Sequence, residues 1–139
     1  MTILSAGPVL RLLYAAAIVA ACFAFYALVR AAVLSRAGRS ARGNALLSPG
    51  VPGVVFFTSP DCVTCKALQR PALREVQRNL EGCIQVVEVD TTERPDLARS
   101  WSVLSVPTTF ILNREGRPVH VNHGATSARK LLGQLQAAL

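Results

Sequence analysis

Hydrophobic and polar positions follow two different patterns along the chain. Leu12 to Val29 reads LLYAAAIVAACFAFYALV, which is 18 residues without a charge. As a helix this run would be about 27 Å long, close to the hydrocarbon thickness of a bilayer. Arginines flank it, and a tyrosine lies near each end, where amphipathic rings are favoured. The pattern predicts a transmembrane anchor within residues 1–34 that contacts the lipid bilayer through residues 12–29.

From Val51 onward, short apolar runs alternate with segments of helical periodicity. The run GVVFFT is apolar up to its last residue, as expected for a central strand covered on both faces. A turn at 113–117 joins two later strands into a hairpin. In chain order we predict strand 53–58, helix 62–79, strand 84–89, helix 95–101, strands 108–112 and 118–122, and helix 126–139. The order β-α-β-α-β-β-α predicts a small α/β sandwich over residues 51–139, preceded by one transmembrane helix.

Residues 35–50 read SRAGRSARGNALLSPG and differ in composition from both neighbours. They are rich in Ser, Gly, Arg and Pro, which are typical of turns and loops. The composition predicts a linker between anchor and domain, with at most a short turn of structure.

Positive charge is concentrated around the predicted span. Residues 1–42 hold five arginines and no acidic residue, and so contribute +5 of the net charge of +7. The domain that follows is nearly balanced, so the sequence indicates no nucleic-acid partner. Four of the five arginines follow the span, and the positive-inside rule then favours a single-pass protein with its domain on the cytoplasmic side. The opposite orientation is the alternative.

Two other interpretations of the apolar run stay open. One is a cleaved signal peptide, although no clean cleavage site precedes a polar segment. The other is a lipoprotein, because Val19-Ala20-Ala21-Cys22 loosely matches a lipoprotein box with Cys22 as the acylated residue. The residues after Cys22 remain apolar, which fits that interpretation poorly.

The candidate chemistry lies in the stretch SPDCVTCK. Cys62 and Cys65 follow a buried strand and open a helix, whose N–H groups and dipole favour a thiolate on the first cysteine. Cys62 is then the expected nucleophile. Cys65, one turn further in, is placed to resolve a mixed disulfide. The pair needs no cofactor, because the two sulfurs are themselves the redox centre.

Two alternatives compete with redox chemistry. A zinc site needs four ligands, and the remaining candidates are Cys83, His120 and His123, with no second cysteine pair. We therefore expect no metal. The other alternative is two unreactive structural thiols. Cys83 itself is expected to be a buried small residue at the start of a strand.

Three stretches carry a family resemblance: the strand-CVTCK-helix unit, VVEVDTTERPDLARSWSVLSVPTTFIL, and GRPVHVNHGATS. From Val51 onward the chain resembles the thioredoxin superfamily. The resemblance implies a thioredoxin-like three-layer sandwich with redox-active Cys62 and Cys65. It also implies a cis-proline loop beside the cysteines, with Val106, Pro107 and Thr108 binding an extended substrate segment. Gly124 matches a glycine that flanks the substrate groove.

The chain departs from that pattern near the cysteines. Asp61 stands where family reductases usually carry Trp, and a carboxylate there opposes a thiolate on Cys62. Phe56 and Val86 stand where those reductases carry a buried Asp and its Lys partner. Cys65 would therefore lack its usual proton acceptor.

These features predict a membrane-anchored thiol-disulfide oxidoreductase that exchanges with protein thiols and disulfides, as a reductase in the expected direction. The anchor suggests a membrane redox partner. One alternative is a non-catalytic tethered module that binds peptides in the Pro107 groove. Another is a thiol donor in cytochrome or metal-site maturation.

Overall fold

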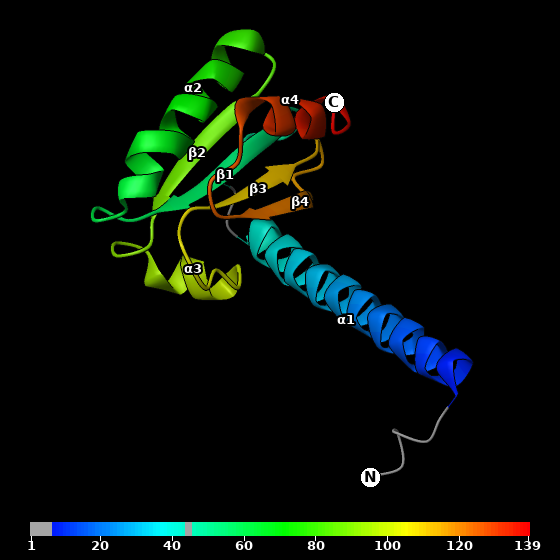
Figure 1. Cartoon of the computed structure of the whole chain (residues 1–139). Helices are drawn as coiled ribbons and strands as arrows, with labels where there is room; N and C mark the ends of the chain where they lie inside the picture. The colour runs from blue at the N-terminus through cyan, green and yellow to red at the C-terminus, as the bar shows by residue number, and fades with distance from the viewer. Residues whose placement is uncertain (1–6, 44–45) are drawn as a thin grey trace. The chain divides into compact units, whose positions relative to one another are not determined.

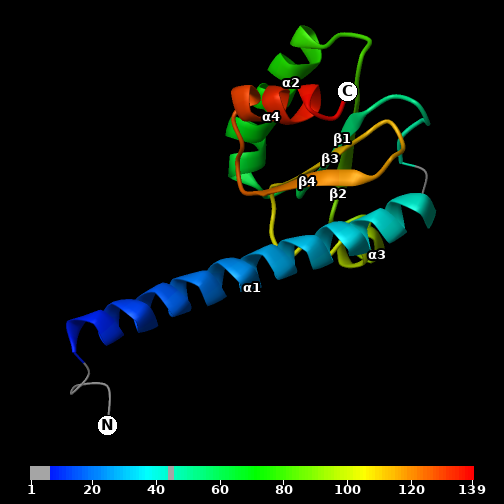
Figure 2. The ribbon, with the colours of Figure 1, turned by 90° about the vertical axis from the view of Figure 1, so that its right-hand side faces the viewer.

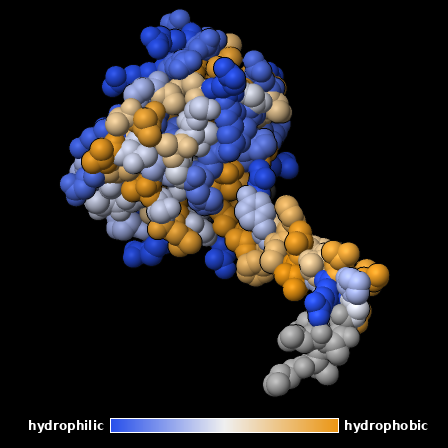
Figure 3. All heavy atoms as spheres, viewed as in Figure 1, coloured by the Kyte–Doolittle hydropathy of each residue, from blue (hydrophilic) through white to orange (hydrophobic). Residues whose placement is uncertain are grey.

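The computed structural model describes residues 7–43 and 46–139 of the chain, which form two compact units that divide between Ala32 and Val33. The first unit is the beginning of α1 (Pro8–Gly43). By length and apolar composition this helix could cross a membrane, and none of its most apolar 18-residue segment is buried. Figure 3 shows apolar side chains gathered along it.

The predicted linker differs from the structure in its first half. Helix α1 continues through Ser35 and ends at Gly43, and this last part belongs to the second unit. Ala37 is fully buried, and the hydroxyl of Ser40 donates to the backbone oxygen of Ser100 over 2.9 Å. The reason is a stripe at spacing four, Val33, Ala37 and Ala41, that packs on the core of the second unit. The domain boundaries themselves stay a prediction.

The second unit is built on one four-stranded sheet of order β2-β1-β3-β4 (Figure 1). The strands are β1 (Gly53–Thr58), β2 (Gln85–Asp90), β3 (Thr108–Leu112) and β4 (Pro118–His123). Strand β1 pairs parallel to β2 and antiparallel to β3, and β3 and β4 form the predicted hairpin. Every residue of β1 is buried, and it pairs on both sides, which confirms it as a central strand.

Helices cover both faces of the sheet, which gives the predicted three-layer sandwich (Figure 2). On one face lie α3 (Pro95–Ser100) and the last part of α1, around the mutually packed rings of Phe57, Trp101 and Phe110. On the other face lie α2 (Arg70–Asn79) and α4 (Ala128–Gln136). That second cluster contains Cys65, so the apolar cores place the candidate chemistry on one defined face.

The segment predicted as a helix over 62–79 is helical from Val63 to Asn79, with a π-helical turn, η1 (Cys65–Gln69), that leads directly into α2. Pro71 has no N–H to donate, and it lies in the first turn of α2, where that loss is tolerated. The expected burial of Cys83 was wrong. Its side chain is exposed, because it lies in the turn before β2, where Gly82 has a φ of 75°. Among the described residues, no group of three or more His, Cys, Asp or Glu could hold a metal ion.

Candidate functional site

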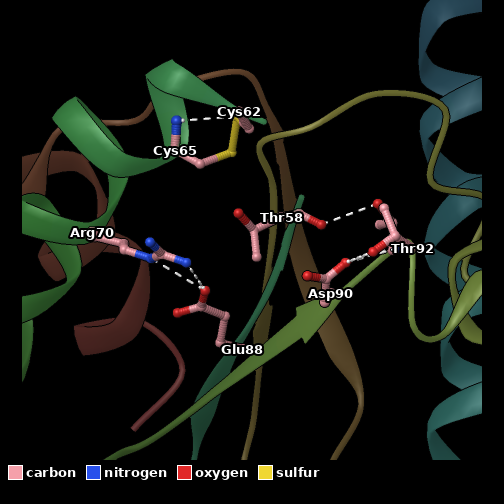
Figure 4. Close-up of polar contacts among 8 residues, drawn as sticks. Thr58, Cys62, Cys65, Arg70, Glu88, Asp90 and Thr92 are labelled. Carbon is pink, nitrogen blue, oxygen red and sulfur yellow. Dashed lines mark hydrogen bonds and ion pairs between the residues drawn. A yellow bond between two sulfur atoms is a disulfide. The ribbon is translucent and has the colours of Figure 1, made fainter. Parts of the chain in front are cut away.

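Cys62 and Cys65 form a disulfide between the end of β1 and the start of the helix (Figure 4). After the buried strand the chain turns at Ser59. The Cys62 N–H donates a hydrogen bond to the Ser59 oxygen, which closes this turn. The N–H of Cys65 donates to the Cys62 sulfur over 3.1 Å. Such a donor stabilises negative charge on that sulfur when the disulfide opens.

The two sulfurs have different surroundings. Cys62 is half-buried, whereas Cys65 is 0% exposed and belongs to the apolar cluster with Val54 and Phe56. A disulfide partner from another protein can therefore reach Cys62 more easily than Cys65. This asymmetry is the one that a nucleophile and a resolving cysteine require.

The loop before β3 lies beside the pair. The Val106–Pro107 peptide bond is cis, and both Cys62 and Val106 pack against the cluster that contains Cys65. The hydroxyl of Thr108 donates to the Ser105 oxygen over 2.7 Å, which fixes the end of the loop. The structure thus brings Val106, Pro107 and the two cysteines to one place.

Gly124 is connected to the same loop. Its N–H donates to the Pro107 oxygen over 2.8 Å, and its φ of 79° lies in the region that favours glycine. Every residue proposed from the sequence for the groove is therefore on one side of the sandwich, at the end where β1 leads into the cysteines.

A buried glutamine, not singled out by the sequence, links this loop to the cysteine helix. Gln69 is fully buried at the end of η1. Its side-chain oxygen accepts from the Thr126 N–H over 2.8 Å, and its amide donates to the Thr126 oxygen over 3.5 Å. Thr126 follows Gly124 by two residues, so Gln69 holds the segment that carries the glycine. The available signal was an amide four residues after Cys65, on the buried face of the helix.

The charged groups that β2 and the start of α2 bring near the pair have partners of their own. Arg70 forms an ion pair with Glu88, and the hydrogen bond from Arg70 and the charge of Glu88 raise the pKa of the guanidinium. The hydroxyl and N–H of Thr92 donate to the Asp90 carboxylate over 2.6 and 2.8 Å and lower its pKa. Phe56 occupies the position of the expected buried carboxylate and packs beside Cys65.

Comparison with known proteins gives the same family from three directions. A family model described as thioredoxin matches residues 43–137. The chain belongs to the thioredoxin family. A thioredoxin-like protein of Synechocystis is 36% identical over 85 residues, which covers 61% of this chain and 79% of the relative. Thioredoxin 1 of Nostoc is 33% identical, covering 68% and 86%.

Other relatives are longer or are known as structures. The chain spans about half the length of a chloroplastic thioredoxin Y of rice, with 35% identity over 63% of this chain and 51% of the relative. The crystal structure of a chloroplastic thioredoxin z has a TM-score of 0.58 and 28% identity, covering 67% and 85%. Thioredoxin homologues are thiol-disulfide oxidoreductases, and the Cys62–Cys65 disulfide is the redox-active group of this thioredoxin-type chain.

Proposed function

We propose that the chain is a membrane-anchored thiol-disulfide oxidoreductase that reduces protein disulfides. The observation that carries this proposal is the pairing of an accessible Cys62 with a buried Cys65 beside the Val106–Pro107 loop. In the dithiol form, the Cys62 thiolate attacks a substrate disulfide and one substrate sulfur leaves as a thiol. Cys65 then attacks Cys62, which restores the intramolecular disulfide and releases the second substrate sulfur.

Substrate binding uses the groove beside the sulfurs. The backbone of Val106 pairs with an extended substrate segment, and Gly124 borders it. Pro107 and Thr108 are buried and hold the loop from behind. Val63 and Leu104 are apolar side chains with large exposed fractions on the segments that carry the cysteines and the proline. They offer apolar contact to the residues that flank the substrate cysteine, and thus favour protein substrates with apolar neighbours there.

The apolar N-terminal helix supports a membrane location for this chemistry. Helix α1 is long and apolar enough to span, and the arginines that follow the run favour a cytoplasmic domain. Reduction is the natural direction in that compartment, and electrons would come from a redox partner at the membrane. Labelling of a single cysteine placed at Ser48, an exposed residue of the segment before β1, tests the orientation in intact cells. Labelling by a membrane-impermeant maleimide would contradict a cytoplasmic domain.

A trapping experiment tests the activity. Cys65→Ser in the full chain, kept in mild detergent, should accumulate mixed disulfides between Cys62 and substrate proteins. With the exposed Cys22 and Cys83 replaced by serine in both variants, the matched variant Cys62→Ser should accumulate far fewer, because the Cys65 sulfur is buried. The reduction potential of the wild type is expected near about −270 mV, as for a reductase, and a value near about −120 mV would indicate an oxidant.

A specific observation also supports a second candidate. Since Phe56 replaces the expected proton acceptor, the domain could bind peptides in the groove without turnover. In that case Cys62→Ser would keep peptide affinity and biological function, and the wild type would not cycle between dithiol and disulfide. Loss of function in Cys62→Ser would exclude the binding module.

A further inference from the structure

Thr58, the last residue of β1, carries a buried hydroxyl that the structure leaves unsatisfied. Its relative exposure is 2%, and Oγ1 has no hydrogen-bond partner among the described residues. The backbone around it is fixed, because the Thr58 oxygen accepts from both the N–H and the hydroxyl of Thr91. An unpaired buried hydroxyl is destabilising, so a chain that keeps one at this position calls for a physical reason.

The hydroxyl lies on the cysteine side of the sheet. Successive side chains of a strand alternate between faces, so Thr58 shares a face with Phe56, which packs in the cluster that contains Cys65. Figure 4 shows the Thr58 hydroxyl pointing toward the disulfide, on the side of the Cys65 sulfur. That sulfur is fully buried among apolar side chains, where a developing thiolate has few sources of stabilisation.

Charged groups on the surrounding elements do not stabilise a thiolate on Cys65. On β2, Glu88 is held by Arg70 of α2, and Asp90 is held by Thr92. The low pKa of Asp90 makes its carboxylate a poor proton acceptor near neutral pH. Strand β3 carries no titratable residue. The remaining titratable or cationic side chains of the turn, η1, β4 and the first turn of α4 are half-buried or exposed: Asp61, Lys66, His120, His123, Arg129 and Lys130.

We propose that Thr58 is a positioning residue whose hydroxyl donates a hydrogen bond to the Cys65 sulfur during resolution. The inference rests on the proposed function and deepens it. In this step Cys65 attacks the mixed disulfide, the Cys62–substrate bond breaks, and the Cys62–Cys65 bond forms. The cysteine pair is oxidised and the substrate sulfur is reduced. The Cys65 thiol loses its proton to solvent before the attack, and the substrate sulfur leaves as a thiolate that takes up a proton from solvent according to its own pKa. Thr58 therefore keeps its own proton and acts by stabilising charge.

The test separates the two steps with one equivalent of an aromatic disulfide, 5,5′-dithiobis(2-nitrobenzoate). The reduced full chain is used in mild detergent, with Cys22 and Cys83 replaced by serine because both are exposed free thiols. Attack by Cys62 releases the first coloured thiolate, and attack by Cys65 releases the second. The pH midpoint of the second phase is then compared among variants.

Thr58→Val, which is nearly isosteric, should leave the first phase unchanged. It should raise the midpoint of the second phase by about one pH unit, so that release is about tenfold slower below both midpoints. Thr58→Ser should restore the second phase to within about twofold. The matched control is Thr109→Val, which removes the other unpaired hydroxyl on this face, opposite Phe56 on β3, and should leave both phases unchanged.

The outcomes distinguish the two proposals. If the wild type releases both equivalents and Thr58→Val has the same second-phase midpoint, the role of Thr58 is wrong and the proposed function stands. The role of Thr58 is also wrong, and the proposed function still stands, if Thr58→Ser does not restore the second phase. If the wild type releases only the first equivalent, Cys65 does not resolve, and the proposed function and this inference both fail.

Discussion

Gln69 gives the sharpest test of how the site is held together. Its amide makes two hydrogen bonds to the backbone of Thr126, at 2.8 and 3.5 Å, and both residues are buried. Gln69→Leu keeps the volume nearly constant, so the cavity contribution is small. It leaves the Thr126 N–H buried without a partner, which costs about 1–3 kcal/mol. We expect the free energy of unfolding to fall by about 2 kcal/mol, measured by urea denaturation of the oxidised full chain.

The same substitution should affect substrate binding. Thr126 is two residues from Gly124, whose N–H donates to the Pro107 oxygen. If about half of the lost free energy destabilises the ordered conformation of this loop, the affinity for a protein substrate decreases about fivefold. The KM for a protein disulfide should rise by that factor, whereas the reaction with a small aromatic disulfide should not change.

The chain contains a matched control. Asn122 and Gln134 exchange two side-chain hydrogen bonds of 2.7 and 3.0 Å between β4 and α4, and neither bond involves the backbone of the loop. Gln134→Leu should lower stability by about 1 kcal/mol and leave the KM unchanged. If Gln69→Leu loses stability and keeps its KM, the link between Gln69 and the groove is refuted. If its stability is also unchanged, the two hydrogen bonds contribute nothing.

Three further outcomes follow from individual contacts. Gly53→Ala should lower the free energy of unfolding by about 1–3 kcal/mol in urea, because the added Cβ would lie 2.6 Å from the Gln85 backbone oxygen; an unchanged midpoint would contradict this packing. The stabilisation from the low pKa of Asp90 is present above its unfolded pKa and is lost as the pH falls through the folded value, below about pH 4. Thr92→Val should raise the pKa of the Asp90 carboxyl, measured by NMR, toward its ordinary range. An unchanged pKa would mean that another group causes the shift. Leu104→Ser, at a side chain that is 94% exposed, should raise the KM for substrates with apolar flanks without changing stability, and equal KM values would remove Leu104 from the groove.

Some elements of the fold could be predicted because their cause is local. GVVFFT is apolar at every position before Thr58, as expected for a strand covered on both faces, and β1 is that strand. The hairpin between β3 and β4 follows from the turn at Asn113, whose side chain accepts from the Arg117 N–H. The cysteine pair was likewise readable, because a strand, a turn and CVTC are contiguous in sequence.

Other features depend on contacts that are distant along the chain. The burial of the Gln69 side chain depends on its hydrogen-bond partner Thr126, which is 57 residues away. The burial of Ala37 depends on a spacing of four residues hidden in a segment whose Ser, Gly and Arg content indicates a loop. Cys83 stands directly before the apolar residues of β2, which indicates the start of a strand. The positive φ of Gly82 instead keeps Cys83 in the turn that precedes β2. In each case a tertiary contact or a backbone angle overrides the local propensity.

The surroundings of the two cysteines also indicate which step of the proposed cycle is difficult. Cys62 is half-buried, and its sulfur accepts a hydrogen bond from the Cys65 N–H, so the start of the helix stabilises its thiolate. Cys65 is enclosed by apolar side chains, with Phe56 in place of a carboxylate. Charge on Cys65 is therefore the more costly of the two, and resolution is the step that a neighbouring polar group can accelerate most. The Thr58 hydroxyl is the polar group that β1 contributes on that face, so its removal should affect the second step and not the first.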